Sequence, residues 1–202
     1  AALLDWAERN DALVIEDDYD GEYRYDREPV GALQGLAPER VAYLGTASKV
    51  LAPALRLGWA VLPSWLEREF AEEKGWADGG SSTIDQLALA DMLERGDLDR
   101  HLRRVRASYR RRRDLLLAGI ERLFPGMRTL GVAAGLHVAL QPPRLVDERA
   151  LVTRAAERGV ALYAFRRRGE PPASTLLLGY ANVPEPSIDP ALRELRAAWD
   201  SA

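Results

Sequence analysis

Three short, uninterrupted apolar runs near the start of the chain constrain its fold more than any other feature. They cover residues 12–15, 41–44 and 57–62, and Pro63 ends the last. Runs of this length predict strands of a parallel sheet covered on both faces. The connections leave too little chain for a crossover helix each, which needs about a dozen residues, so at least one neighbouring pair is expected to be antiparallel or non-adjacent. A sheet this small indicates part of a larger α/β structure.

The rest of the chain predicts helices first and then a mixture of strands and helices. Helices are expected at 2–9, from about 65, at 84–95 and at 98–123, where Pro125 and Gly126 follow. Short strands at 136–140, 161–164 and 175–180 then alternate with helices at 147–158 and 188–200, which is typical of an α+β subdomain. We therefore predict three regions: a partial large domain at residues 1–63, a connecting segment at 64–80, and a small C-terminal α+β domain at 81–202.

Composition excludes several classes of protein. The 202 residues contain no cysteine, so disulfides, thiolate metal sites and cysteine nucleophiles are excluded. The two histidines, His101 and His137, are too far apart in the sequence to suggest a metal site. No apolar run approaches the roughly 18 residues of a membrane span, and the opening segment is an acidic amphipathic helix rather than a signal peptide. We expect a cytoplasmic protein without a membrane partner.

A lysine directly after the second apolar run is the strongest chemical signal. The segment Gly45-Thr46-Ala47-Ser48-Lys49 follows this run, and Arg56 lies seven residues beyond the lysine. An amine that forms an imine, with hydroxyls and a guanidinium nearby, suits a cofactor that carries an aldehyde and a phosphate. The only other lysine is Lys74. A surface lysine in a polar loop is the plain alternative.

An acidic cluster follows the first apolar run. Glu16, Asp17 and Asp18 precede Tyr19 at the predicted carboxyl end of a strand, where ligands gather in open α/β sheets. A buried carboxylate there can accept a hydrogen bond from a protonated pyridine nitrogen, and the phenol can donate to a ring oxygen. By itself, the cluster is more typical of a solvated acidic loop, and a helix N-cap would also explain one of the aspartates.

Together these segments resemble the aminotransferase-like domain of the MocR/GabR-type bacterial transcription regulators, which has the fold-type I pyridoxal-phosphate fold. The family pattern IEDDYDxEFRY matches IEDDYDGEYRY at 15–25, and GTxSKxLAPxLRLGYxVLP matches GTASKVLAPALRLGWAVLP at 45–63. The segment at 29–36 and the helix that begins at His101 also resemble the family, so the likeness extends over almost the whole chain.

The resemblance implies a role for each candidate site residue. Lys49 is similar to the lysine that forms the imine with pyridoxal 5'-phosphate. Asp17 corresponds to the partner of the pyridine nitrogen, and Tyr19 to the residue that meets the 3-hydroxyl. Asp17 is favoured over Asp18 by its spacing from the tyrosine, and alternation along an extended segment sends the two carboxylates to opposite faces. Arg56 is implied to hold the phosphate, with Thr46 and Ser48 as weaker candidates.

Two departures from the family pattern bear on function. These 202 residues resemble only the later half of the effector domain, without the winged-helix DNA-binding domain. Leu177 stands where many aminotransferases carry the arginine that captures the substrate carboxylate. Arg166, Arg167 and Arg168 are candidate replacements, although a solvated loop is the favoured interpretation.

The resemblance therefore predicts an effector-sensing domain that binds an amine or an amino acid. It also implies a homodimer and contact with DNA only through the absent domain. An active class I/II aminotransferase and an interaction module with a dead cofactor site are the alternatives.

The long helix carries eight arginines between residues 100 and 113. Such a run can bind nucleic-acid phosphates, but its acidic flanks favour an exposed face with intramolecular partners. His101 is expected on the same face, and His137 as a packed strand residue.

Overall fold

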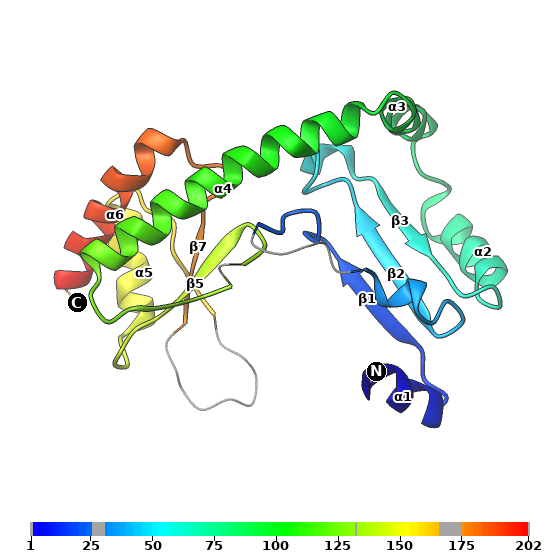
Figure 1. The fold of residues 1–202 in the computed structure, drawn as a ribbon, viewed down its shortest axis with the longest axis horizontal. Coiled ribbons are helices and arrows are strands. Elements are labelled where there is room, and N and C mark those ends of the chain that lie inside the picture. Colours follow the sequence, from blue (N-terminus) through cyan, green and yellow to red (C-terminus); the bar gives the residue numbers. More distant parts are fainter. Residues whose placement is uncertain (1, 26–30, 132, 166–174, 202) are drawn as a thin grey trace. The chain divides into compact units, whose positions relative to one another are not determined.

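The computed structural model describes residues 2–25, 31–131, 133–165 and 175–201 (Figure 1). By its contacts the chain forms two compact units. Unit 1 is Ala1–Glu22 with Glu28–Leu102, and unit 2 is Tyr23–Arg27 with Arg103–Ala202. The change of unit lies between Leu102 and Arg103, inside a helix, whereas the sequence placed the connection at 64–80. The predicted domain boundaries stay a prediction.

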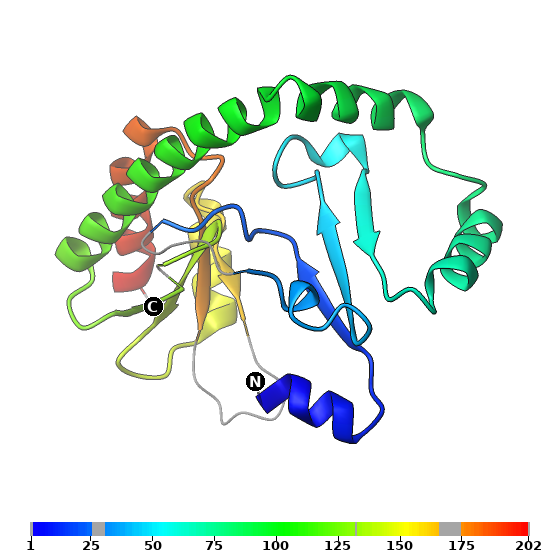
Figure 2. The same ribbon diagram turned by 45° about the vertical axis from the view of Figure 1, so that its right-hand side comes forward.

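Unit 1 is built on a three-stranded sheet in the order β1-β2-β3. Strands β1 (Val14–Asp18) and β2 (Val41–Thr46) are parallel, and β3 (Gly58–Val61) is antiparallel to β2. Figure 2 shows the two parallel arrows and the reversed third one. The expectation of at least one antiparallel pair is confirmed. The first strand lies later than predicted, because the acidic residues belong to it.

Helices account for most of the remaining residues of unit 1. They are α1 (Ala2–Arg9), α2 (Glu67–Asp78), α3 (Thr83–Glu94) and the first turns of α4 (Asp97–Leu123), together with two short 3-10 helices, η1 (Leu33–Gly35) and η2 (Pro53–Leu55). Neither α2 nor α3 contains a buried residue.

Both faces of the unit 1 sheet carry exposed apolar side chains. Ile15 is 64% exposed on one face, and the strand register places the exposed Trp59 and Val61 of β3 on the other. The prediction that both faces are covered is therefore wrong for the described residues. The open surface is what a sheet shows when part of its cover lies outside these residues.

Unit 2 is an α+β structure with an antiparallel sheet in the order β4-β5-β7-β6. The strands are β4 (Arg128–Leu130), β5 (His137–Gln141), β6 (Tyr163–Ala164) and β7 (Leu176–Gly179). Its helices are the later turns of α4, α5 (Glu148–Glu157) and α6 (Glu185–Asp200). The sequence predicted these elements except β4.

One apolar core holds unit 2 together. Val138 and Leu140 of β5 and Leu176 and Leu178 of β7 are buried in it, and each helix adds apolar side chains. The helix residues are Leu116 and Ile120 of α4, Leu151 and Ala155 of α5, and Ile188, Leu192 and Leu195 of α6.

The segment at Tyr23–Tyr25 joins this core from far away in the sequence. The Gly135 amide donates to the Tyr23 carbonyl at 2.9 Å, and the Tyr25 hydroxyl donates to the Gly135 carbonyl at 3.0 Å. Both tyrosines are buried. Unit 2 is therefore completed by residues that precede most of unit 1.

None of the described helices is long and apolar enough to cross a membrane.

Candidate functional site

One edge of the unit 1 sheet collects the residues that the sequence singled out. Because β1 and β2 are parallel, their carboxyl ends meet at the same edge, where Asp18 pairs with Gly45. Strand β3 is antiparallel and begins there, with Gly58 opposite Thr46. This topology brings Asp17 and Tyr19 to the edge that also carries Thr46, Ser48, Lys49 and Arg56.

The three acidic residues of β1 have different surroundings. Glu16 accepts hydrogen bonds from the amides of Leu33 and Gln34 at 3.0 and 3.1 Å, and so caps the start of η1. Asp18 accepts from the Gly21 amide at 2.8 Å and from the Tyr43 hydroxyl at 3.1 Å. Both carboxylates are used to hold local structure.

Asp17 points to the other face of the strand. It is exposed, and no hydrogen bond or ion pair joins its carboxylate to a described residue. The alternation predicted from the sequence therefore separates Asp17 from Asp18. Of the acidic residues in this strand, Asp17 has the carboxylate that is available to a ligand.

Tyr19 follows the same face. Its side chain is 46% exposed, and the negative charge of Asp20 raises the pKa of its phenol, with burial as the next cause. A hydrogen bond with the Asp20 side chain is a further cause, so the protonated hydroxyl already has a partner that a ligand would have to replace.

Lys49 lies in a single helical turn after β2. The Leu51 amide donates to the Ala47 carbonyl at 2.8 Å, and the Ala47 amide donates to the Leu57 carbonyl at 3.0 Å. Lys49 occupies the middle of this turn and is exposed. The turn therefore presents the lysine at the sheet edge from a backbone fixed at both ends.

The strand before this turn requires glycine at position 45. A Cβ there would lie 2.3 Å from the Trp59 ring, so only glycine lets the indole of β3 pack over β2.

The three predicted phosphate ligands are not equivalent. The Thr46 hydroxyl donates its single proton to the Leu57 carbonyl at 3.2 Å and accepts from the Ser48 amide at 3.1 Å. Its proton is thus already used. The Ser48 hydroxyl and the Arg56 guanidinium have no hydrogen bond to a described residue, and Arg56 is exposed at a left-handed φ of 52°. Ser48 and Arg56 are better placed to donate to an anion.

His101 differs from its predicted role. Its ring Nε2 lies 2.9 Å from the Val50 carbonyl oxygen, directly after Lys49, and the side chain is half-buried. The expectation that it shares the exposed arginine face is wrong. Its spacing of four residues from the apolar Val105, on one face of the predicted helix, was the signal that could have placed it.

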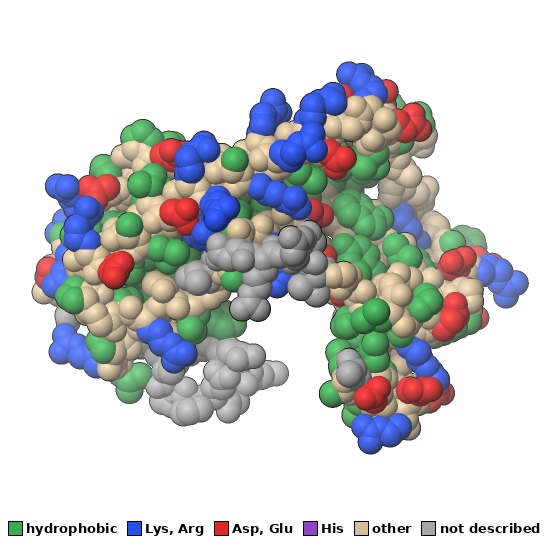
Figure 3. Space-filling view, in the orientation of Figure 1, with side chains coloured by type: hydrophobic (Ala, Val, Ile, Leu, Met, Phe, Trp, Pro, Cys, Tyr) green, Lys and Arg blue, Asp and Glu red, His purple; other side chains and the backbone are tan. Residues whose placement is uncertain are grey.

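Several arginines of α4 have intramolecular partners, as the sequence indicated. Arg111 pairs with Glu185 at 3.0 Å, and Arg112 donates to the Ala181 carbonyl. Arg113 is buried over the Tyr25 ring. Figure 3 shows basic side chains along the visible face of this helix, and in α4 all of these are arginines. The exposed ones include Arg103, Arg104 and Arg110.

The remaining candidates lie in unit 2. His137 begins β5, but its side chain is exposed, so the expectation of packing is wrong. Leu177 lies on β7, half-buried on the face away from the core. Arg166, Arg167 and Arg168 lie outside the described residues.

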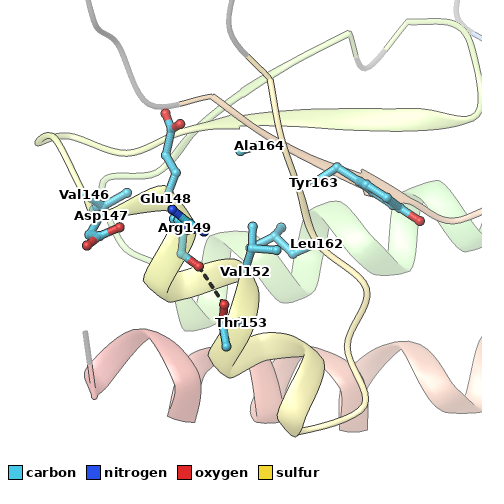
Figure 4. Close-up of a pocket in the computed structure, with 9 residues that line it drawn as sticks. All are labelled: Val146, Asp147, Glu148, Arg149, Val152, Thr153, Leu162, Tyr163 and Ala164. Atoms are coloured by element: carbon cyan, nitrogen blue, oxygen red, sulfur yellow. Dashed lines mark hydrogen bonds between the residues drawn. The ribbon is translucent and has the colours of Figure 1, made fainter.

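Unit 2 also contains a hollow of about 610 Å³ beside α5 and β6. Figure 4 shows its lining, where the Thr153 hydroxyl donates to the Arg149 carbonyl at 3.0 Å. None of the predicted site residues lines it.

Comparison with known proteins agrees with the geometry. No protein-family model matches the chain. It is 38% identical over 201 residues to the uncharacterized HTH-type transcriptional regulator YdeL of Bacillus subtilis, covering 98% of this chain and 43% of that protein. It is 34% identical to the probable rhizopine catabolism regulatory protein MocR of Rhizobium meliloti, covering 98% and 41%.

Among solved structures, α-aminoadipate aminotransferase LysN of Thermus thermophilus matches with a TM-score of 0.89 and 28% identity, over 99% of this chain and 53% of that one. That structure is a complex with N-(5'-phosphopyridoxyl)-L-leucine. The fold is thus the fold-type I aminotransferase fold. Within it, the chain belongs to the aminotransferase-like family of the MocR/GabR-type regulators. It spans 43% of the length of YdeL and 41% of MocR.

Proposed function

We propose that this chain is the pyridoxal-phosphate-binding, effector-sensing part of a MocR/GabR-type transcription regulator. The observation that carries the proposal is the shared sheet edge. There β1 and the segments next to the strand ends bring together a lysine, an available carboxylate, a protonated phenol and an exposed arginine. The likeness to regulators and to an aminotransferase with a phosphopyridoxyl group supports it.

The donor set at this edge fits pyridoxal 5'-phosphate. When bound, the cofactor supplies an electrophilic aldehyde carbon and a ring that withdraws electrons. The Lys49 amine is the nucleophile for that carbon, and the Asp17 carboxylate accepts the pyridine N–H and keeps it charged. Tyr19 would donate to the ring oxygen instead of to Asp20. Arg56 holds the phosphate through its paired N–H groups, with Ser48 as a second donor and Thr46 as the weakest.

Sensing then depends on the state of Lys49. In the proposed role, an effector with a primary ammonium group would exchange with Lys49, and the protons that the effector nitrogen loses would pass to the released lysine, which would then be an ammonium at the sheet edge. That change of charge and position favours one conformation over another, which a DNA-binding domain outside these residues would read. We propose a homodimer in the cytoplasm, with DNA contact only through that domain.

An active aminotransferase is the second candidate, favoured by the likeness to LysN. Lys49 would then also act as the general base that moves a proton of the substrate. Leu177 counts against it, because an aliphatic side chain cannot capture an α-carboxylate through paired hydrogen bonds.

The test uses the full-length gene product that contains this chain. Its absorbance is recorded with added pyridoxal phosphate, and the complex is then reduced with borohydride and mapped by peptide mass. We expect one reduced adduct, on Lys49. The matched variants are Lys49→Ala, which should abolish the adduct, and Lys74→Ala, which should leave it unchanged. No adduct, or one shared by both lysines, would overturn the proposal.

The same preparation separates a sensor from an enzyme. A sensor should change its DNA affinity when an amine is added and release no keto acid. Stoichiometric keto-acid release from added amino acids would favour the aminotransferase.

A further inference from the structure

The turn that carries Lys49 contacts a residue far away in the sequence. This residue is His101, which lies 51 positions after Val50. Leu51 and Ala47 close the turn locally, and the Val50 carbonyl points away from it to the ring of His101, at 2.9 Å from Nε2. Val50 directly follows the lysine. His101 lies in the part of α4 that belongs to unit 1, so the contact is internal to that unit.

The chemistry of this contact fixes its direction. A carbonyl oxygen only accepts, so the proton of the hydrogen bond is on Nε2, as in the Nε2–H tautomer or the imidazolium. Val50 is 5% exposed and Ala47 is 2% exposed, so the turn is shielded from water on this side. Hydrogen bonds in such surroundings are stronger than at an open surface.

Apolar side chains do not fill all the space between the turn and α4. Val50 and Leu51 line a cavity of about 350 Å³, together with Leu98 and Leu102, which lie three residues before and one residue after His101 in α4. A cavity gives up contacts that would otherwise fix the position of its walls. The directional bond to His101 therefore restrains the turn where the described apolar side chains do not fill the space.

We propose that His101 is a positioning residue, which holds the turn so that the Lys49 amine faces the cofactor aldehyde. The inference rests on the proposed function, since it assigns to Lys49 its bond with the cofactor. His101 does not touch the cofactor in this proposal; it acts through the backbone of Val50.

The test compares variants of the full-length protein. His101→Phe keeps an aromatic ring but has no N–H, and His101→Gln restores a donor at the ε position. Loss of one net hydrogen bond predicts a roughly fivefold rise in the dissociation constant for pyridoxal phosphate in His101→Phe. The rate of formation of the reduced adduct on Lys49 should fall by a similar factor. His101→Gln should return both to within about twofold of the wild type.

A second measurement on the same variants needs no cofactor. Hydrogen exchange of the Leu51 amide should be roughly fivefold faster in His101→Phe, because opening of the turn loses one restraint. His137→Phe is the matched control, since it makes the same change on an exposed strand residue of unit 2. If His101→Phe does not fold, His101→Ala takes its place with the same expectation.

The outcomes separate the two proposals. Absence of the wild-type adduct on Lys49 would overturn the proposed function, and the positioning role with it. A normal wild-type adduct, with His101→Phe equal to the wild type in affinity and labelling rate, would overturn the positioning role alone. Failure of His101→Gln to rescue would also overturn it, because the ring and not its hydrogen bond would then matter.

Discussion

The two compact units of this chain differ in how they bury apolar side chains. Unit 2 contains the large apolar cluster, in which strands β5 and β7 and helices α4, α5 and α6 all bury residues. In unit 1 the buried apolar side chains are mostly small, and α2 and α3 bury none. Several large apolar side chains of unit 1 are exposed to solvent. The exposed fraction is 88% for Trp76 and 79% for Ile84.

This difference matters because the candidate site lies entirely on the less well covered unit. The sheet edge with Lys49 has its backbone hydrogen bonds in place, yet apolar side chains on both faces of the sheet are exposed among the described residues. Exposed apolar patches of this kind mark surfaces that associate with other protein chains. We infer that unit 2 is stable through its own core, whereas unit 1 depends on further cover for its rigidity.

The largest expected effect on stability comes from shortening an apolar side chain in the core of unit 2. Leu140→Ala should lower the free energy of unfolding by about 2–5 kcal/mol, because Leu140 is buried at 1% exposure and the change leaves a cavity. Ile15→Ala in unit 1, at 64% exposure, should cost about 0.5 kcal/mol or less in this 202-residue chain. Hydrogen exchange of peptides from each unit measures both. A cost above about 2 kcal/mol for Ile15→Ala would contradict the comparison.

Within unit 1, neighbouring carboxylates should separate stability from binding. Asp18→Ala removes the acceptor of two hydrogen bonds and should cost about 1–3 kcal/mol. Asp17→Ala removes no such bond, so its stability should stay within about 0.5 kcal/mol while its affinity for pyridoxal phosphate falls. Thermal unfolding and cofactor titration of both variants give the two readouts. Equal losses of stability would argue against the different roles assigned to the two residues.

Alkaline titration compares a tyrosine from each unit. Burial raises the pKa of Tyr43 in unit 1 to about 12, with the Asp18 charge and hydrogen bond as further causes. Burial also raises the pKa of Tyr25 in unit 2, to well above the range in which folded proteins are titrated. The folded state therefore favours both neutral phenols. The stability from Tyr43 should be complete below pH 10, its ordinary pKa, and be lost as the pH rises to about 12.

Phenolate absorbance follows this titration. Tyr43→Phe should remove a step near pH 12, whereas Tyr25→Phe should change only the step that accompanies unfolding. A Tyr25 phenolate that forms before unfolding would show that the core of unit 2 is less closed than its contacts indicate.

The smallest effect is expected where the two units are alike. Each has an exposed ion pair, Arg40 with Asp11 at 2.6 Å in unit 1 and Arg111 with Glu185 at 3.0 Å in unit 2. Arg40→Ala and Arg111→Ala should each cost less than about 1 kcal/mol, because exposed pairs are screened by water and salt. Urea unfolding at low and high salt checks this. A larger cost that persists at high salt would contradict it.

Much of the fold could be predicted because apolar periodicity follows local structure. All three strands of unit 1 and the long α4 helix lie close to their expected positions. The first strand was placed too early because charged residues usually end a strand. Here Glu16 and Asp18 stay within β1, since amides of Leu33, Gln34 and Gly21 satisfy their carboxylates. Strand β4 was missed because three residues at a sheet edge leave no periodic pattern.

The residues gathered at the candidate site could also be predicted, because the motifs place them after neighbouring strands. Which of their hydrogen-bonding groups are available to a ligand could not be predicted. That Thr46 has already donated its proton to Leu57, and that His101 reaches Val50, are consequences of tertiary contacts between distant segments. No local pattern encodes such contacts, although the position of His101 beside the apolar stripe of α4 was a partial signal.

The early position of Tyr23 and Tyr25 has a consequence for synthesis of the protein. The hydrogen bond from Tyr25 to Gly135 joins residues 110 positions apart. At usual rates of translation, about 5–20 residues per second, the tyrosines wait for roughly 5–20 s before their acceptor exists. During that time the strands of unit 1 are complete while these aromatic rings have no core to enter. A ribosome that stalls before Gly135 therefore leaves a nascent chain with exposed tyrosines, a ready target for chaperones.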